Sequence, residues 1–195
     1  MQLIPNELYH VYNQGNNQGI IFRERTDYLR FLLKYKSLVA PHCQILCYCL
    51  MPNHFHFLVN ITEKGNEKIK LGGIQMDKLS NGFRLLLSEF ASEMNAKYRR
   101  TGSVFRQKTK GKLLHDESEN YAYNCFHYIH QNPLNANLVH KLEDWEFSSF
   151  VDYAGLRDGK LCDKDFAKQF FEIDAKRFYE ESYSIISDEV IAKLF

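Results

Sequence analysis

Hydrophobic and polar positions along the chain change period several times, and each change marks a predicted element. Short apolar runs that are rich in aromatic and β-branched residues and bounded by Gly, Asn or Pro predict strands. Segments whose apolar residues recur every three or four positions predict helices that bury one face. The predicted strands are residues 8–14, 43–51 and 54–61, the predicted helices are residues 25–39, about 77–99 and 118–132, residues 63–73 predict a polar loop, and a further strand or hairpin is predicted within residues 102–115.

Individual residues predict where these elements begin and end. Asp27 and Ser118 are expected to cap two of the helices, because a side-chain oxygen can accept the unpaired amide hydrogens of a first turn. Pro133 is expected to end the third helix, since proline has no amide hydrogen to donate. The Pro52-Asn53 pair predicts the turn that joins two of the strands.

The order of these elements is strand, helix, two strands, helix, strand and helix. This order matches an α+β fold with a ferredoxin-like split βαβ antiparallel sheet and an added helix, which carries several tyrosines, laid on the sheet. Residues after about 155 read as a helical C-terminal extension. We therefore expect one domain over residues 1–153 and an extension over residues 154–195.

Composition narrows the class of protein. With 45% hydrophobic residues the chain can bury a core, and no apolar run reaches membrane-spanning length, so no membrane association is expected. The first residues lack the charged start and the apolar stretch of a signal peptide. The five cysteines are an odd number without a CxxC pair, which favours reduced thiols in a cytoplasmic protein over disulfides or structural zinc.

Basic residues are concentrated in one segment, although the formal net charge of the chain is only +1. The run KYRRTGSVFRQKTKGK, residues 97–112, contains no acidic residue. Such a run can bind phosphate even when the total charge is near zero, although a solvated surface loop has the same pattern. The candidate phosphate contacts are Lys97, Arg99, Arg100, Arg106, Lys108, Lys110 and Lys112.

Two histidines lie inside one predicted strand, in the sequence MPNHFHFLV. His54 and His56 are two positions apart, so they share one face of the strand while Phe55 and Phe57 point the other way. Two adjacent imidazoles on an open face can chelate a divalent ion, or one can act as a base beside the other. Two histidines with ordinary hydrogen bonds are the alternative for an isolated pair of this kind.

The last predicted core helix carries a stripe of phenols and carboxamides. At helical spacing Tyr121, Asn124, Tyr128 and Asn132 lie along one line, and the apolar residues beside them would dock on the sheet. Tyr128 could then serve as a nucleophile, and Asn132, one turn later, could offer its carbonyl oxygen to a metal. Tyr128 could equally be a tyrosine at the boundary between core and solvent.

The combination of these motifs resembles a known family, the HUH-type single-tyrosine transposases, and within it the REP-associated tyrosine transposases. MPNHFHFLV is similar to the histidine motif of that family, and YIHQNPLNANLV, residues 128–139, is similar to its tyrosine motif. Further similarity occurs in the family's order at residues 9–22, 101–107 and 144–150. The resemblance covers about residues 8–153 and not the C-terminal extension.

The resemblance implies a role for each matching residue. His54 and His56 would be metal ligands, Tyr128 the nucleophile and Asn132 a third, amide ligand, although many relatives use glutamine there and Gln131 is the adjacent residue. The implied cofactor is Mg²⁺ or Mn²⁺, and because imidazole favours softer ions, Ni²⁺ or Zn²⁺ could occupy the site in vitro. One departure is that Gln14 and Gln18 stand where relatives often carry arginines.

The implied activity is that of a DNA transposase or endonuclease. It would cut and rejoin single-stranded or hairpin DNA through a 5′-phosphotyrosine intermediate, as a monomer or a weak homodimer. Two other functions fit the residues taken singly. A non-catalytic nucleic-acid-binding ferredoxin-like domain would bind DNA without a covalent adduct, and a metal-dependent hydrolase would cleave DNA without the tyrosine.

Overall fold

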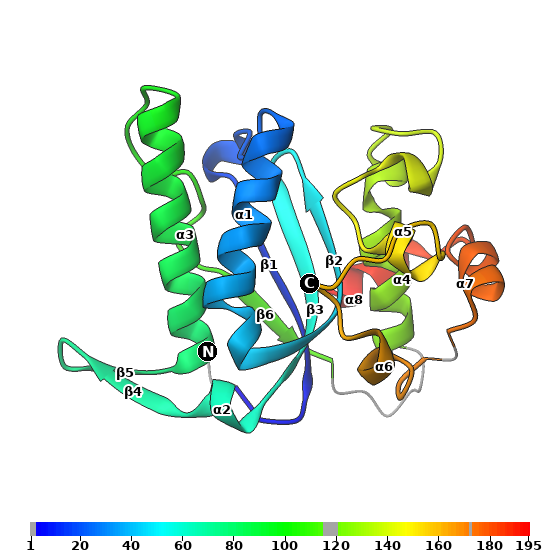
Figure 1. The fold of residues 1–195 in the computed structure, drawn as a ribbon, viewed down its shortest axis with the longest axis horizontal. Helices are drawn as coiled ribbons and strands as arrows, with labels where there is room; N and C mark the ends of the chain where they lie inside the picture. The colour runs from blue at the N-terminus through cyan, green and yellow to red at the C-terminus, as the bar shows by residue number, and fades with distance from the viewer. Residues whose placement is uncertain (1–2, 115–120, 172) are drawn as a thin grey trace.

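The computed structural model describes residues 3–114, 121–171 and 173–195. Its centre is a four-stranded antiparallel sheet with the strand order β2-β3-β1-β6 (Figure 1). The strand β3 lies between β1 and β2, the two strands that are connected through helix α1. The predicted α+β class and antiparallel sheet are therefore confirmed. The strands are β1 (Leu8–Gln14), β2 (Cys43–Met51), β3 (His54–Ile61) and β6 (Lys110–Leu113).

Two long helices cover one face of the sheet. Phe55 and Phe57 of β3 point toward this layer, where Tyr35 stacks on Phe57 with ring centroids 3.9 Å apart and Phe31 lies 5.3 Å from Phe55. Phe90 of the second helix meets Phe31 edge to face at 5.2 Å. Burial of these aromatic rings helps to hold the two layers together, because each ring removes a large apolar area from water. The helices are α1 (Arg25–Leu38) and α3 (Lys78–Lys97), both close to their predicted ranges.

A third layer lies on the other face of the sheet, beside β2 (Figure 1). The helix α4 packs against β2, where the thiol of Cys47 lies 4.0 Å from the carbonyl oxygen of Phe126. The C-terminal extension is helical, as expected, and wraps α4, because the Phe126 ring contacts Phe171 and Phe178. The elements of this layer are α4 (Tyr121–Asn135), α5 (Phe150–Tyr153), α6 (Lys164–Ala167), α7 (Ala175–Glu181) and α8 (Asp188–Lys193).

The prediction of a polar loop at residues 63–73 is wrong. A short helix, α2 (Glu63–Asn66), leads into a two-stranded hairpin of β4 (Lys68–Leu71) and β5 (Ile74–Asp77). The turn between these strands consists of Gly72 and Gly73, both with positive φ. Two-residue hairpin turns favour glycine for this reason, so the adjacent glycines were the missed signal.

Two further boundaries differ from those expected. Pro133 lies inside α4, which continues to Asn135, because proline removes one hydrogen-bond donor but keeps a helical φ. Of the predicted strand or hairpin within residues 102–115, β6 forms a regular strand, and Phe105 makes an isolated bridge to Gly15. Ser118, the expected cap of α4, lies outside the described residues.

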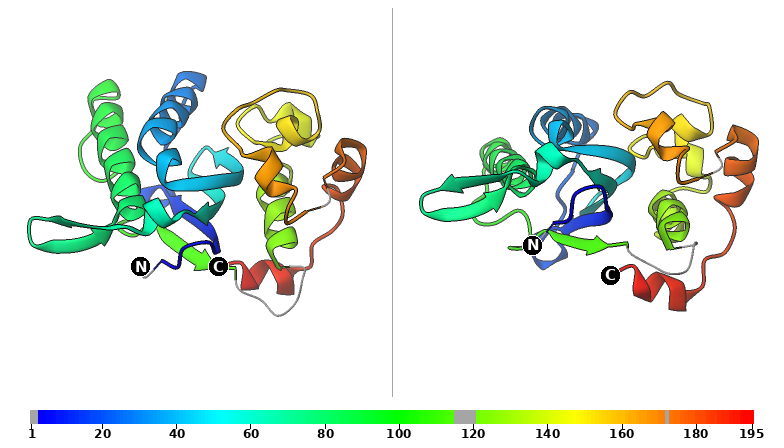
Figure 2. Two further views of the ribbon diagram at one scale, coloured as in Figure 1. Left: turned by 60° about the horizontal axis from the view of Figure 1, so that its bottom comes forward. Right: turned by 90° about the horizontal axis from the view of Figure 1, so that it is seen from below.

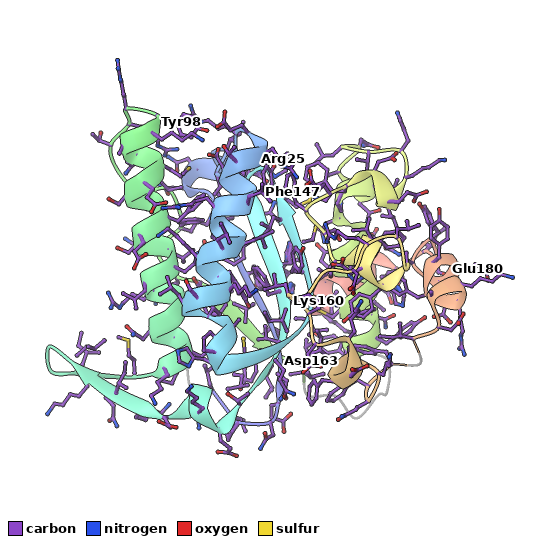
Figure 3. The ribbon with its side chains drawn as sticks, in the orientation of Figure 1. Arg25, Tyr98, Phe147, Lys160, Asp163 and Glu180 are labelled. Atoms are coloured by element: carbon purple, nitrogen blue, oxygen red, sulfur yellow. The ribbon has the colours of Figure 1, made fainter. Side chains whose placement is uncertain are left out.

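Asp27 does not cap α1, contrary to the expectation. The cap is Glu24, and Asp27 lies three residues later, where its carboxylate accepts hydrogen bonds from the amides of Glu24 and Arg23. The same carboxylate accepts from Lys97 and from the hydroxyl of Tyr98, each at 2.6 Å. Figure 3 shows Tyr98 at the end of α3, level with the start of α1 near Arg25. Asp27 therefore joins the first turn of α1 to the end of α3.

Two findings bear on the expected class of protein. No helix within residues 3–114, 121–171 and 173–195 is long and apolar enough to cross a membrane. Each of the five cysteines is free and buried, and Cys47 and Cys49 fill the core as small side chains between β2 and α4.

The Asp27→Asn variant should lose about 2 kcal/mol of unfolding free energy, because Lys97 and Tyr98 lose a buried charged acceptor. Burial alone raises the pKa of Asp27, but the bonds from Lys97, Tyr98 and two backbone amides outweigh it and leave that pKa below its ordinary value. The stabilisation is therefore present above the unfolded-state pKa of about 4 and is lost as the pH falls through the lower folded-state pKa. Denaturant unfolding of both proteins across this pH range measures it.

The matched control is Glu24→Gln, which changes an exposed carboxylate that also contacts Lys97. Its loss should be clearly smaller than that of Asp27→Asn, because solvent screens exposed pairs. Equal losses in the two variants would contradict the role assigned to the buried carboxylate.

Candidate active site

The pairing of β1 with β3 brings two polar pairs together on the face of the sheet that α1 does not cover. Tyr12 lies opposite His56, and Gln14 lies opposite His54. Phe55 points to the opposite face, as the alternation of a strand requires. These four polar residues line a cavity of about 380 Å³, whose wall is completed by Tyr128 of α4.

His54 is held by its neighbour in the turn before β3. Its Nδ1 lies 2.7 Å from the side-chain oxygen of Asn53, which can only accept, so Nδ1 carries the proton and Nε2 keeps its lone pair. Burial lowers the pKa of His54, and an interaction with the side chain of Asn132 partly offsets this. The ring is therefore neutral at neutral pH, and Nε2 is its unprotonated nitrogen.

His56 is buried and bonded to a second histidine, which sequence analysis missed. Its Nδ1 lies 2.8 Å from Nε2 of His10, and the two rings lie edge to edge with centroids 5.0 Å apart and planes 25° from parallel. Burial holds the pKa of His56 well below its ordinary value and lowers the pKa of His10 to about 4. His10 shares a strand face with Tyr12, a pattern that is visible in the sequence, but its closeness to His56 depends on the register of β1 against β3.

Tyr128 reaches the cavity from α4. Its half-buried ring meets the ring of His56 edge-on, with centroids 5.9 Å apart. Burial raises the pKa of Tyr128 to about 12, although a bond from Asn132 acts in the opposite direction. The hydroxyl is therefore protonated at neutral pH and needs help to become a nucleophile.

The two candidate amide ligands face different parts of the molecule. Asn132 interacts through its side chain with both His54 and Tyr128, and its Nδ2 donates to the backbone oxygen of Tyr128 at 2.8 Å. Gln131 points away, and its Nε2 donates to the carbonyl oxygens of Ser182 and Ser184. Of the two, Asn132 is therefore the one whose side chain lies beside the histidines.

The donors gathered here fit a divalent cation that is held weakly. Within the described residues, no group of three or more His, Cys, Asp or Glu side chains is placed to hold a metal ion. His54 keeps an unprotonated imidazole nitrogen, and with His56 and the Asn132 side chain it forms a neutral set without a carboxylate. Such a set fits a cation that completes its coordination with oxygens of a bound substrate.

Part of the basic segment lies at the cavity. Arg106, Lys108 and Lys110 line it together with the histidines and Tyr128. Lys110 pairs with Tyr12 and Lys112 with His10, so both lysines belong to the strand face that carries the site. The edge strand β6 thus places Lys110 at the cavity, and Lys112 on the same face but not among the residues that line it.

The remaining basic residues lie elsewhere. The ammonium of Lys97 is already paired with Asp27 and Glu24 at 2.6 and 2.5 Å, which argues against the expected phosphate contact. Arg99 and Arg100 follow the end of α3 and are not among the residues that line the cavity. The aromatic residues of the segment are also engaged, because Phe105 is buried and the Arg23 guanidinium covers the Tyr98 ring.

The last described residues return to the site, which the sequence did not indicate. The Phe195 ring lies 5.1 Å from Tyr12, 5.6 Å from Tyr128 and 6.0 Å from His56, measured between centroids. The backbone oxygen of Leu194 lies 3.0 Å from Nδ1 of His10. Figure 2 shows α8 next to α4 and the chain end next to β6. The extension therefore contributes directly to the walls of the cavity.

Comparison with known proteins adds one likeness. No protein-family model matches the sequence, and no curated protein does. A solved structure of a REP-associated tyrosine transposase bound to a REP hairpin is similar over 94% of this chain and 95% of that one, with a TM-score of 0.58 and 17% sequence identity. The chain therefore shares its fold with that transposase over nearly the whole length of both.

Adjacent residues of α4 allow a direct test of the donor set. Asn132→Ala should weaken the binding of Mn²⁺ at least about tenfold, because it removes an amide oxygen beside the histidines. Gln131→Leu should leave Mn²⁺ affinity unchanged and should instead destabilise the packing of the extension, since two carbonyl groups lose their donor. Calorimetric titration with Mn²⁺ and thermal unfolding separate the two effects. A loss of Mn²⁺ affinity in Gln131→Leu alone would reverse the assignment.

Proposed function

We propose that this protein is a metal-assisted tyrosine transposase or endonuclease that cuts and rejoins single-stranded or hairpin DNA. The observation that carries the proposal is that the Tyr128 phenol and the His54–His56 pair, from separate elements, line one cavity with a basic rim. The likeness to a REP-associated tyrosine transposase bound to a REP hairpin supports DNA as the substrate. The strand order β2-β3-β1-β6 also agrees with a ferredoxin-like split βαβ core for this activity.

The proposed reaction is a transesterification. The Tyr128 oxygen attacks a DNA phosphorus, a new oxygen–phosphorus bond forms, and the bond to the 3′ oxygen breaks. The products are a 5′-phosphotyrosine link and a free 3′-hydroxyl. Because a phosphodiester is exchanged for another of similar energy, a 3′-hydroxyl can reverse the step and join strands without nucleotide hydrolysis.

Several residues of the chain would lower the barrier to this step. His54, His56 and Asn132 would hold Mg²⁺ or Mn²⁺, which supplies positive charge at the phosphate oxygens when bound. Lys108 and Lys110 line the same cavity, where their positive charge would attract the phosphate. The bond from Asn132 lowers the pKa of Tyr128 and so favours its phenolate, against the larger effect of burial.

The arrangement also supports a preferred oligomeric state. His54, His56, Tyr128 and Asn132 all come from one chain, so the cavity needs no tyrosine helix from a second copy. We therefore propose that the active form is a monomer, or a weak homodimer whose subunits each hold a whole site.

A covalent-adduct assay tests the proposed nucleophile. With Mn²⁺ and labelled single-stranded and hairpin DNAs, the wild-type protein should form a denaturation-resistant adduct that Tyr128→Phe reduces to background. His54→Ala and His56→Ala should each weaken it. Tyr123→Phe is the matched control, because Tyr123 lies on the same helix but packs on His127 away from the cavity.

Each alternative function predicts a different result in this assay. Cleavage that persists in Tyr128→Phe would favour a metal-dependent hydrolase. DNA binding without any adduct, unaffected by the Tyr128 change, would favour a non-catalytic binding domain. An adduct that is lost in Tyr12→Phe and kept in Tyr128→Phe would identify Tyr12, the other phenol at the cavity, as the nucleophile.

The basic rim is tested separately through the salt dependence of binding. Replacing Arg106, Lys108 or Lys110 with alanine should weaken single-stranded DNA binding and lower the slope of log affinity against log salt by about 0.7 for each phosphate contact removed. Lys36→Ala, on the exposed face of α1, should leave the slope unchanged. A slope that responds to Lys36 and not to the rim would place the DNA on the other side of the sheet.

A further inference from the structure

Three groups form a buried hydrogen-bonded chain behind the candidate metal ligands. The carbonyl oxygen of Leu194 lies 3.0 Å from Nδ1 of His10, and Nε2 of His10 lies 2.8 Å from Nδ1 of His56. All three residues are nearly inaccessible, with exposed fractions of 0% for Leu194 and His10 and 3% for His56. Water therefore does not compete for these bonds, and the direction of each bond is set by the groups themselves.

The Leu194 carbonyl determines that direction. A carbonyl oxygen accepts and never donates, so Nδ1 of His10 must carry the proton of its neutral ring. Nε2 of His10 is then an acceptor, and Nδ1 of His56 must donate to it. The remaining nitrogen of His56, Nε2, keeps its lone pair, as Nε2 of His54 does through its bond to Asn53. A bond between two imidazoles would by itself permit either direction.

We propose that His10 is a positioning residue that holds His56 in the tautomer with a free Nε2, and that the Leu194 carbonyl sets the direction of this bond. The proposal deepens the proposed function and rests on it only in treating His56 as a metal ligand. It also gives the C-terminal segment a chemical role at the site, because the packing of Leu194 against His10 selects which nitrogen of His56 is free.

Loss of His10 would reverse the preference of His56. A free neutral histidine favours the tautomer with the proton on Nε2, which would place a proton where the metal should bind. Loss of an outer hydrogen-bond partner of a metal ligand typically costs about 10- to 100-fold in metal affinity. His54 serves as an internal reference, since its own partner is Asn53 and not His10.

The test measures tautomers directly in the metal-free protein of residues 1–195, without DNA. In a two-bond proton–nitrogen correlation spectrum at neutral pH, Nε2 of both His54 and His56 should appear as unprotonated nitrogens. In His10→Leu the His56 pattern should change to a protonated Nε2 while that of His54 stays, and Mn²⁺ affinity should fall about 10- to 100-fold. His10→Gln, whose side-chain oxygen can accept from His56, should restore both.

A full-chain variant tests the role of Leu194 without changing His10. Leu194→Asp puts a charge in a buried position and should release the segment, so that His56 becomes a mixture of tautomers. An unchanged His56 pattern in this variant would remove Leu194 from the proposal. If His10→Leu does not fold, the wild-type spectrum still decides, because a protonated Nε2 on His56 there would overturn the proposal.

These outcomes are independent of the adduct assay. The expected tautomers together with a missing adduct would refute the proposed function and leave the role of His10 standing. A Tyr128-dependent adduct together with a protonated Nε2 on His56 would refute the role of His10 alone.

Discussion

The register of β1 against β3 is the constraint on which the site depends. It sets Tyr12 opposite His56 and Gln14 opposite His54, and it brings His10 within hydrogen-bond reach of His56. Because side chains alternate along a strand, a slip of one residue would turn His54 and His56 into the aromatic core. Phe55 and Phe57, stacked against α1, resist that slip through the apolar area they bury. The aromatic packing on one face of the sheet therefore fixes the positions of the histidines on the other face.

The C-terminal extension gives the site its second wall and much of its rigidity. It encloses α4 on the side away from the sheet. Polar residues on that side of the helix would otherwise be exposed to water, and here they are buried and hydrogen-bonded. His127 bonds Ser182, and Gln131 bonds the carbonyl groups of Ser182 and Ser184, all in the extension. A buried polar group must be paired to avoid a large cost, so these bonds hold α4 at one rotation and keep Tyr128 directed at the histidines.

Charge is divided sharply between the floor and the rim of the cavity. Burial keeps His10, His54 and His56 neutral, and the raised pKa of Tyr128 keeps its phenol neutral as well. Positive charge comes from Arg106 and Lys108, which precede β6, and from Lys110, its first residue. The histidines and Tyr128 at the base of the cavity are neutral, and the basic residues at its edge are positive. Such a cavity suits a phosphate diester, because the diester brings the negative charge that the residues at the base lack.

The sequence alone determined the elements whose signals are local. Strand alternation separated His54 and His56 from Phe55, and helical spacing brought Tyr128 and Asn132 into one stripe, because each pattern lies within a few residues. The predictions of a loop at Gly72-Gly73 and of a cap at Asp27 are wrong, although both signals are local.

Tertiary structure decided the rest. These contacts join residues that are far apart in the chain. They are the bond of His10 to His56, the pairing of Lys97 with Asp27, the bonds that turn Gln131 away from the cavity, and the contacts of Leu194 and Phe195 at the site. Strand register and helix packing determine such contacts, so the spacing of side chains within one segment cannot predict them.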